Sequence, residues 1–168
     1  MQHSSLDSFL ARPALTKGPV AIVIAEDEVE VASTIAHKLK AGFLTVLLLA
    51  DPLLRLDDLP PGVERIDMDP LAEGAAVEAV NRIQASAPGL WFYYGYNAEY
   101  LFHPFCETRN IREMLTFQTE ERRDSVLTYV VDLYAADLTA HPNAVSLTSA
   151  HMDRSGYYAL ARKDPEAN

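Results

Sequence analysis

Four acidic residues follow apolar runs of the sequence and are the clearest candidates for ligand chemistry. Glu26, Asp51 and Asp69 each come directly after such a run, and Glu99 follows the aromatic run that starts at Trp91. Carboxylates that converge on one edge of a parallel sheet bind a ribose, a base edge or a hydrated metal. The alternative is that strand ends face water, which suits any single acid. For the four acids together, a shared site and separate exposed positions are equally good interpretations.

The stretch from Trp91 to Leu101 supplies the remaining candidates. It follows a Pro-Gly break, begins with large uncharged residues and turns polar at Asn97 and Glu99. Such a run predicts a central strand, buried on both faces, that delivers polar groups to a cleft. The alternative is an edge of the core with a surface glutamate. His103 comes next to this cleft and is a further candidate, beside the simpler interpretation of a structural histidine.

No strong catalytic motif accompanies these residues. The sequence has no Gly-x-Gly-x-x-Gly, no Walker loop and no Gly-x-Ser-x-Gly elbow. None of the five histidines forms a pair with the spacing of metal ligands. The single cysteine, Cys106, excludes an internal disulfide and a cysteine zinc cluster. The chemistry therefore depends on the acids and on their neighbours.

The pattern of apolar residues predicts the elements that position the acids. Strands are expected over 20–25, 43–50, 63–68 and 91–96, with helices over 29–41 and 71–87 between them. This alternation predicts an α/β fold with a Rossmann-like, mostly parallel sheet flanked by helices. Further along, Asn110 is expected to cap a helix over 111–121. Strands are expected over 125–134, 144–147 and 157–161.

Composition limits the partners. The 168 residues carry a formal net charge of -10, which argues against general binding to nucleic acid or to an anionic membrane. No stretch reaches the roughly 20 apolar residues of a membrane span, and no secretory signal begins the chain. We expect a cytoplasmic protein.

Several segments resemble the opening of family-2-type glycosyltransferases. They are Ala25-Glu26, the helix that ends His37-Lys38-Leu39-Lys40-Ala41-Gly42-Phe43, and the strand that ends in Asp51. The segment from Tyr96 to Leu101 is similar to the place where that family writes Asp-x-Asp-Glu-Phe-Leu. The resemblance covers residues from about 19 to 135. It implies a lead-in over 1–18 and one GT-A-type domain over 19–168, incomplete at its C-terminal end.

The resemblance also implies a ligand and a metal. Family members bind a nucleotide sugar, usually with Mg2+ or Mn2+ held by the paired aspartates. Glu26 and Asp51 would then touch the nucleotide, and Glu99 would stand near the sugar diphosphate. The two aspartate positions read Tyr96 and Ala98 here, so the motif is degenerate and metal binding as in the family is doubtful. We therefore expect a glycosyltransferase-like protein, which either transfers a glycosyl group or has lost that ability.

Two other functions are compatible with the sequence. Glu26-Asp27-Glu28 also resembles the acidic pocket of a response-regulator receiver domain, with Asp67 or Asp69 near the phosphorylated position. Such a domain would bind Mg2+. The third possibility is an interaction domain whose aromatic patch is buried against a partner. Binding of nucleotides distinguishes the first possibility from the other two.

Overall fold

The computed structural model describes residues 1–56 and 59–152 and divides the chain into two compact units, Met1–Arg123 and Asp124–Asn168. The sequence predicts a single domain from residue 19 onward, whereas the first unit begins at Met1 and ends at Arg123. The helices and strands of the first unit are β1 (Gln2–His3), α1 (Leu6–Leu10), β2 (Val20–Ala25), α2 (Val31–Ala41), β3 (Thr45–Ala50), β4 (Val63–Asp67), α3 (Ala75–Ser86), β5 (Phe92–Tyr96) and α4 (Ile111–Glu120).

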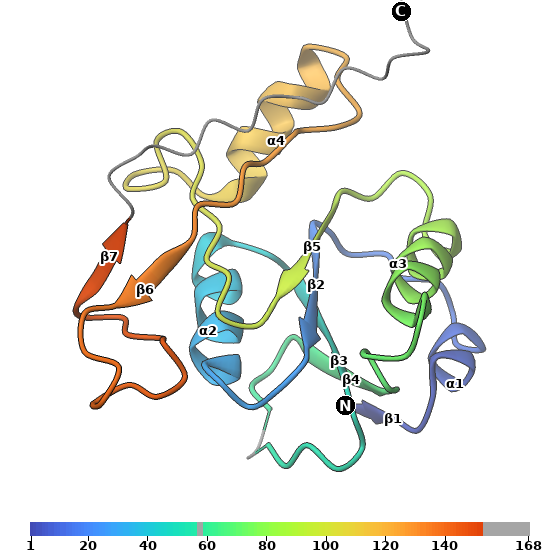
Figure 1. Ribbon diagram of the computed structural model, residues 1–168. Coiled ribbons are helices and arrows are strands. Elements are labelled where there is room, and N and C mark those ends of the chain that lie inside the picture. Colours follow the sequence, from blue (N-terminus) through green and yellow to red (C-terminus); the bar gives the residue numbers. More distant parts are fainter. Residues whose placement is uncertain (57–58, 153–168) are drawn as a thin grey trace, which may run out of the picture. The chain divides into compact units, whose positions relative to one another are not determined.

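The first unit is built on a five-stranded parallel sheet in the order β1-β4-β3-β2-β5 (Figure 1). The predicted fold class, an α/β fold with a Rossmann-like sheet flanked by helices, is confirmed. The strand order reverses at β2, because β3 and β4 lie on one side of it and β5 lies on the other. In sheets of this kind, ligands bind outside the carboxyl ends of the strands, near such a reversal.

Alternate residues of the strands face two separate cores, as the period of two in a strand requires. Ala21, Val23 and Ala25 of β2 pack on the same side as α2 and α4. Val20, Ile22 and Ile24 pack on the other side, with α1 and α3. Figure 1 shows α2 on one face of the sheet and α3 on the opposite face. Both faces of β2 are therefore buried, which explains its uninterrupted apolar run.

The prediction that the aromatic stretch forms a central, doubly buried strand is wrong. β5 is an edge strand that pairs only with β2 among the described strands. Tyr94 is 59% exposed and Tyr96 is 38% exposed, while Tyr93 packs against the core under α2. Aromatic residues suit a half-buried edge as well as a core, so the apolar run alone does not distinguish the two positions.

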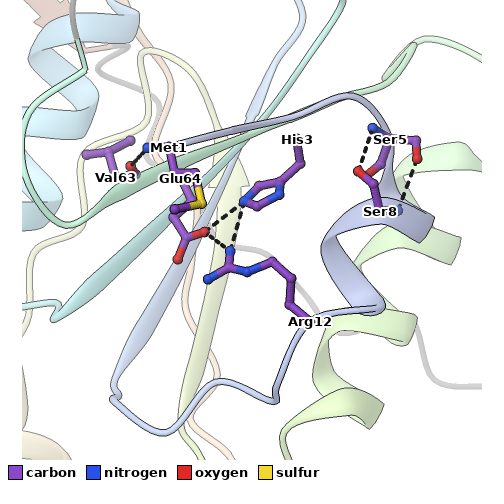
Figure 2. Close-up of polar contacts among 7 residues, drawn as sticks. All are labelled: Met1, His3, Ser5, Ser8, Arg12, Val63 and Glu64. Atoms are coloured by element: carbon purple, nitrogen blue, oxygen red, sulfur yellow. Dashed lines mark hydrogen bonds and ion pairs between the residues drawn. The ribbon is translucent and has the colours of Figure 1, made fainter.

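Residues 1–18, which the sequence predicts to be a lead-in, form a strand and a helix of the first unit. Gln2 and His3 form β1, which extends the sheet beside β4. Ser5 and Ser8 form a capping box at the start of α1 (Figure 2). Phe9 of the same helix is buried in the core. Figure 2 also shows the Met1 ammonium group donating a hydrogen bond to the Val63 carbonyl. Backbone pairing, a cap and one buried aromatic side chain thus attach this segment to the sheet.

The helix ends follow local sequence signals. α2 ends at Gly42, whose φ of 103° is the left-handed conformation that glycine adopts readily. α4 begins at Asn110, which forms a capping box with Glu113, as the sequence predicts. α2 begins at Val31 rather than at Val29, so residues 26–30 form a loop after β2. This loop carries Glu26 and is central to the site.

The second unit contains a short antiparallel pair of strands, β6 (Leu133–Ala135) and β7 (Ala150–Met152). The strand predicted over 125–134 is formed only at its end, and no strand covers 144–147 within the described residues. The strand predicted over 157–161 lies outside the described residues. No helix in the described part of the chain is long and apolar enough to cross a membrane.

Candidate functional site

Three of the four predicted acids line one hollow at the carboxyl edge of the sheet. Glu26 follows β2, Asp51 follows β3 and Asp69 comes two residues after β4. Because β4, β3 and β2 are neighbours in the sheet, their carboxyl ends converge. The hollow has a volume of about 360 Å³ and is lined by Ala25, Glu26, Asp51, Leu53, Leu54, Asp69, Pro70 and Leu71. Three of these residues are acidic and none is basic.

Two identical turns build most of this hollow. Asp51-Pro52-Leu53 follows β3, and Asp69-Pro70-Leu71 follows β4. In each turn, Oδ1 of the aspartate accepts a hydrogen bond from the backbone N–H of the leucine, at 2.7 Å from Leu53 and 2.9 Å from Leu71. Such a bond fixes a tight turn without any other partner. In residues 1–56 and 59–152, no group donates a hydrogen bond to Oδ2 of either aspartate. One oxygen of each aspartate thus fixes its turn, and the other is free to accept a hydrogen bond from a ligand.

The two leucines of these turns are unusually exposed. Leu53 is 87% exposed and Leu71 is 68% exposed, although both line the hollow. Large apolar side chains beside a few hydrogen-bonding groups are typical of small-molecule sites. The sequence analysis missed both leucines. The repeated tripeptide Asp-Pro-Leu at the ends of two successive strands is the signal that could have identified them.

Arg65 holds the backbone of the first of these turns, the loop after β3. Its guanidinium group donates to the carbonyl oxygens of Asp51 and Leu54, at 2.7 Å and 2.8 Å. Its Nε also lies 2.6 Å from Oδ1 of Asp67, and the whole side chain is buried. Because three bonds hold the planar guanidinium, the loop after β3 is anchored to β4.

Glu26 is held at the hollow by its backbone. Its N–H group donates a hydrogen bond of 3.0 Å to Oδ1 of Asn97, at the end of β5. Nδ2 of the same asparagine donates to Oδ1 of Asp27, at 2.6 Å, and to the carbonyl oxygen of Val29, at 2.9 Å. Asn97 is predicted to bind substrate. The structure instead places its amide group against the loop 26–29, and it does not line the hollow.

Glu99 does not join the other three acids. Ala98 has a φ of 60°, which turns the chain after β5 toward α2. The next residues bond along one side of that helix: Ala98 N–H to Thr34, the Tyr100 hydroxyl to Ser33, and the Leu101 carbonyl to His37. Oε2 of Glu99 accepts a hydrogen bond from the Tyr96 N–H group at 2.9 Å. The prediction that Glu99 shares the cleft of Glu26 and Asp51 is therefore wrong.

A buried lysine supports the same segment. Lys38 is fully buried in α2, donates to the Glu99 carbonyl oxygen at 3.0 Å and lies 4.1 Å from the centre of the Tyr93 ring. Burial lowers the pKa of Lys38 to about 8, although the nearby Glu99 carboxylate opposes the shift. Burial also raises the pKa of Tyr93 to about 12, and Glu99 adds to that effect. Lys38 belongs to α2 and does not line the hollow.

His103 also lies away from the hollow. Its side chain is buried, and Nδ1 lies 3.1 Å from the carbonyl oxygen of Pro104. It is not among the residues that line the space beside Glu26 and Asp51. This placement agrees with the simpler interpretation of a structural histidine.

The residues present do not fit the metal that the resemblance implies. At the two aspartate positions, Ala98 has no donor atom and Tyr96 carries a phenol. The glutamate of the motif, Glu99, is engaged with the Tyr96 N–H group. No group of three His, Cys, Asp or Glu side chains in the described ranges is arranged to hold a metal ion.

The strand order also bears on the receiver-domain alternative. Receiver domains have the order 2-1-3-4-5, in which the first and third strands are neighbours. Here β3 separates β2 from β4, so the ends of β2 and β4 are two strand spacings apart, about 10 Å. Asp67, one of the candidate phosphorylation positions, is paired with Arg65. The arrangement differs from that of a receiver pocket.

Comparison with known proteins adds no relative. No protein-family model, no curated protein and no solved structure matches the chain. What the site does must therefore be argued from its own residues and from the fold that holds them.

Proposed function

We propose that this chain is a glycosyltransferase-like protein that binds a nucleotide sugar, with the nucleoside part in the hollow after β2, β3 and β4. The single observation that carries the proposal is the convergence of Glu26, Asp51 and Asp69 on one hollow at the carboxyl edge of a parallel sheet. In Rossmann-like proteins, acids at this edge hydrogen-bond the ribose of a nucleotide.

The chemistry of the lining selects the nucleoside. Carboxylate oxygens only accept hydrogen bonds, so they suit a ligand part that is rich in donors. Ribose hydroxyls and the N–H groups of a base are such donors. The apolar side chains of Leu53 and Leu71 offer contact to the flat face of a base. A ligand of this kind uses both the polar and the apolar parts of the lining.

The diphosphate is expected to lie outside the hollow. Three carboxylates, with no basic side chain among the lining residues, repel a phosphate group. The hollow therefore favours recognition through the nucleoside, and we expect a divalent metal to add little to binding. Assays of glycosyl transfer with each nucleotide sugar that binds would identify the sugar donor and its acceptor.

The test is a thermal-shift and calorimetry series with uridine, guanosine and adenosine diphosphates and their sugars, each with and without Mn2+. At a ligand concentration one hundred times Kd, binding stabilises the folded protein by about 2.7 kcal/mol. We expect stabilisation by at least one ribonucleotide and weaker binding of its 2′-deoxy analogue, because a donor hydroxyl is lost. No stabilisation by any member of the series would contradict the proposal.

Isosteric variants locate the binding. Asp51→Asn and Asp69→Asn keep Oδ1, which fixes each turn, and replace only the second oxygen with an NH2 group. Because an acceptor for the ligand becomes a donor, we expect binding to weaken by about tenfold, or 1.4 kcal/mol. Asp124→Asn is the matched control, since Asp124 is exposed and belongs to the second unit. Equal binding by all three variants would place the ligand elsewhere.

A further inference from the structure

Asn97 lies where the strand order reverses, and its side chain joins the ends of two neighbouring strands. Its backbone N–H donates to the carbonyl oxygen of Ile24, at the end of β2. Its amide group makes three further contacts, with the N–H of Glu26, the carboxylate of Asp27 and the carbonyl of Val29. All the polar groups of this side chain are thereby used within the protein.

The chain around Asn97 is held on its other side by α2. The following residue, Ala98, donates its N–H to Thr34, and Lys38 holds the carbonyl of Glu99. Ala98 also has a left-handed φ of 60°, a conformation that a residue with a Cβ adopts only when its surroundings impose it. Asn97 is thus fixed by α2 and by the sheet, while the loop 26–29 is held largely through Asn97.

We infer that Asn97 is a positioning residue, which holds the loop 26–29 so that the Glu26 carboxylate stays at the hollow. Glu26 itself is exposed. It is held by β2, which it directly follows, and by the Asn97 side chain, whose Oδ1 accepts a hydrogen bond from the Glu26 N–H group. While the hydrogen bond between the Glu26 N–H group and Asn97 persists, Glu26 stays in one position for a ligand in the hollow. Without this bond, that position is no longer fixed. The role in ligand binding rests on the proposed function, whereas the fixing of the loop does not.

The contact with Asp27 makes the inference testable by charge. Asn97→Asp keeps Oδ1 for the Glu26 N–H and places a second carboxylate oxygen where Nδ2 now lies 2.6 Å from Asp27. Two ionised carboxylates this close repel each other, so the pKa of one rises. We expect the pair to share a proton at about pH 5 and to be fully ionised at about pH 8. The other titratable side chains on the loop and on α2 are Glu26, Glu28, Glu30, His37, Lys38 and Lys40. Asp27 alone among them bonds to the Asn97 side chain.

The experiment compares wild type, Asn97→Asp, the swap Asp27→Asn/Asn97→Asp, and the control Asn81→Asp on the exposed side of α3. Hydrogen exchange of the Glu26 amide and the Kd for uridine and guanosine diphosphates are measured at about pH 8 and about pH 5. Relative to wild type at the same pH, we expect the Glu26 amide of Asn97→Asp to exchange roughly tenfold faster at about pH 8, and the Kd to be roughly tenfold higher. Both values should return toward wild type at about pH 5, where the shared proton restores a donor.

The swap distinguishes positioning from simple damage to the fold. It places an amide at residue 27 opposite a carboxylate at residue 97, so we expect it to recover part of both values at about pH 8. Asn81→Asp should behave as wild type. Unchanged exchange and unchanged Kd in Asn97→Asp at both pH values would overturn the inference. If wild type binds neither nucleotide, the proposed function fails, and the exchange of the Glu26 amide still decides the role of Asn97.

Discussion

The carboxylates of the first unit fall into two groups that differ in what surrounds them. At the β1–β4 side of the sheet, acids are paired with cations. Oε2 of Glu64 lies 2.8 Å from His3 Nε2 and also contacts the Arg12 guanidinium (Figure 2), and Asp67 bonds to Arg65 and Gln2. At the hollow, among the residues that the structure describes, Asp51 and Asp69 bond only to backbone N–H groups of their own turns.

This difference separates acids that hold the fold together from acids that are available to a ligand. A paired carboxylate has satisfied its hydrogen bonds, so replacing it costs folding free energy. Replacing a carboxylate that has an unused oxygen at a concave surface should change the free energy of unfolding little. It should affect only the binding of a ligand to that oxygen. The predictions below test this separation, from the largest expected change in the free energy of unfolding to the smallest.

Arg65→Met is expected to have the largest effect. Both partners of the Arg65–Asp67 pair are largely buried, with 7% and 11% of their side-chain surfaces exposed. Removing one partner leaves an uncompensated charge, which costs about 3 kcal/mol. The carbonyls of Asp51 and Leu54 also lose their donor. The measurement is urea unfolding followed by the fluorescence of Trp91, the single tryptophan, which belongs to the first unit.

Two further variants show whether this loss comes from the pair. Arg112→Met is the matched control, because Arg112 is exposed on α4, and it should change the free energy of unfolding little. Adding Asp67→Leu to Arg65→Met removes the unpaired carboxylate and should recover part of the loss. A cost below about 1 kcal/mol for Arg65→Met would show that the pair contributes little to stability.

Glu64→Gln is expected to have an intermediate effect. It keeps the shape of the side chain but weakens its bonds to His3 and Arg12. Arg12 is partly exposed, so we expect a loss of about 1–2 kcal/mol at neutral pH. The same urea titration measures it, with Glu73→Gln, at an exposed position, as the control.

The pH dependence of this effect has a defined sign. Burial acts to raise the pKa of Glu64, and the hydrogen bonds from His3 and Arg12 outweigh it, so that the pKa is lowered in the folded protein. The unfolded chain therefore binds the proton more readily, and the stabilisation is present above about pH 4 and lost as the pH falls through the folded pKa. The difference between wild type and Glu64→Gln should shrink on acidification. A difference independent of pH would contradict the assigned cause.

The sequence predicts the sheet and its helices well because they follow hydrophobic period and length. The capping box at Asn110 and the glycine at the end of α2 are local signals of the same kind. The strand and helix within residues 1–18 could not be predicted in this way. β1 has two residues and α1 has five, which are too few to show a hydrophobic period. The strand expected over 125–134 shows the converse. A β-prone composition does not create a strand unless another strand pairs with it.

The site could be predicted only in part, and the reason is geometric. Glu26, Asp51 and Asp69 directly follow strands or lie within two residues of one, so the sheet fixes where they lie. Glu99 comes three residues after β5, and one residue with a positive φ, Ala98, sends it toward α2 instead. No period or spacing reports such a turn, because alanine rarely adopts it.

Asp51→Asn and Asp69→Asn are expected to have the smallest effects on stability. Each variant keeps the oxygen that accepts the leucine N–H, and the free energy of unfolding should stay within about 0.5 kcal/mol of wild type. The formal net charge of -10 favours a small gain, since each substitution removes one negative charge. Asp67→Asn, the same chemical change in a paired acid, should cost more because it weakens the bond to Arg65. The decisive result is the difference among these three variants in urea unfolding. If Asp51→Asn destabilised the protein as much as Asp67→Asn, then Asp51 would belong with the acids that hold the fold, and the hollow would lose one of the three carboxylates proposed to bind the ligand.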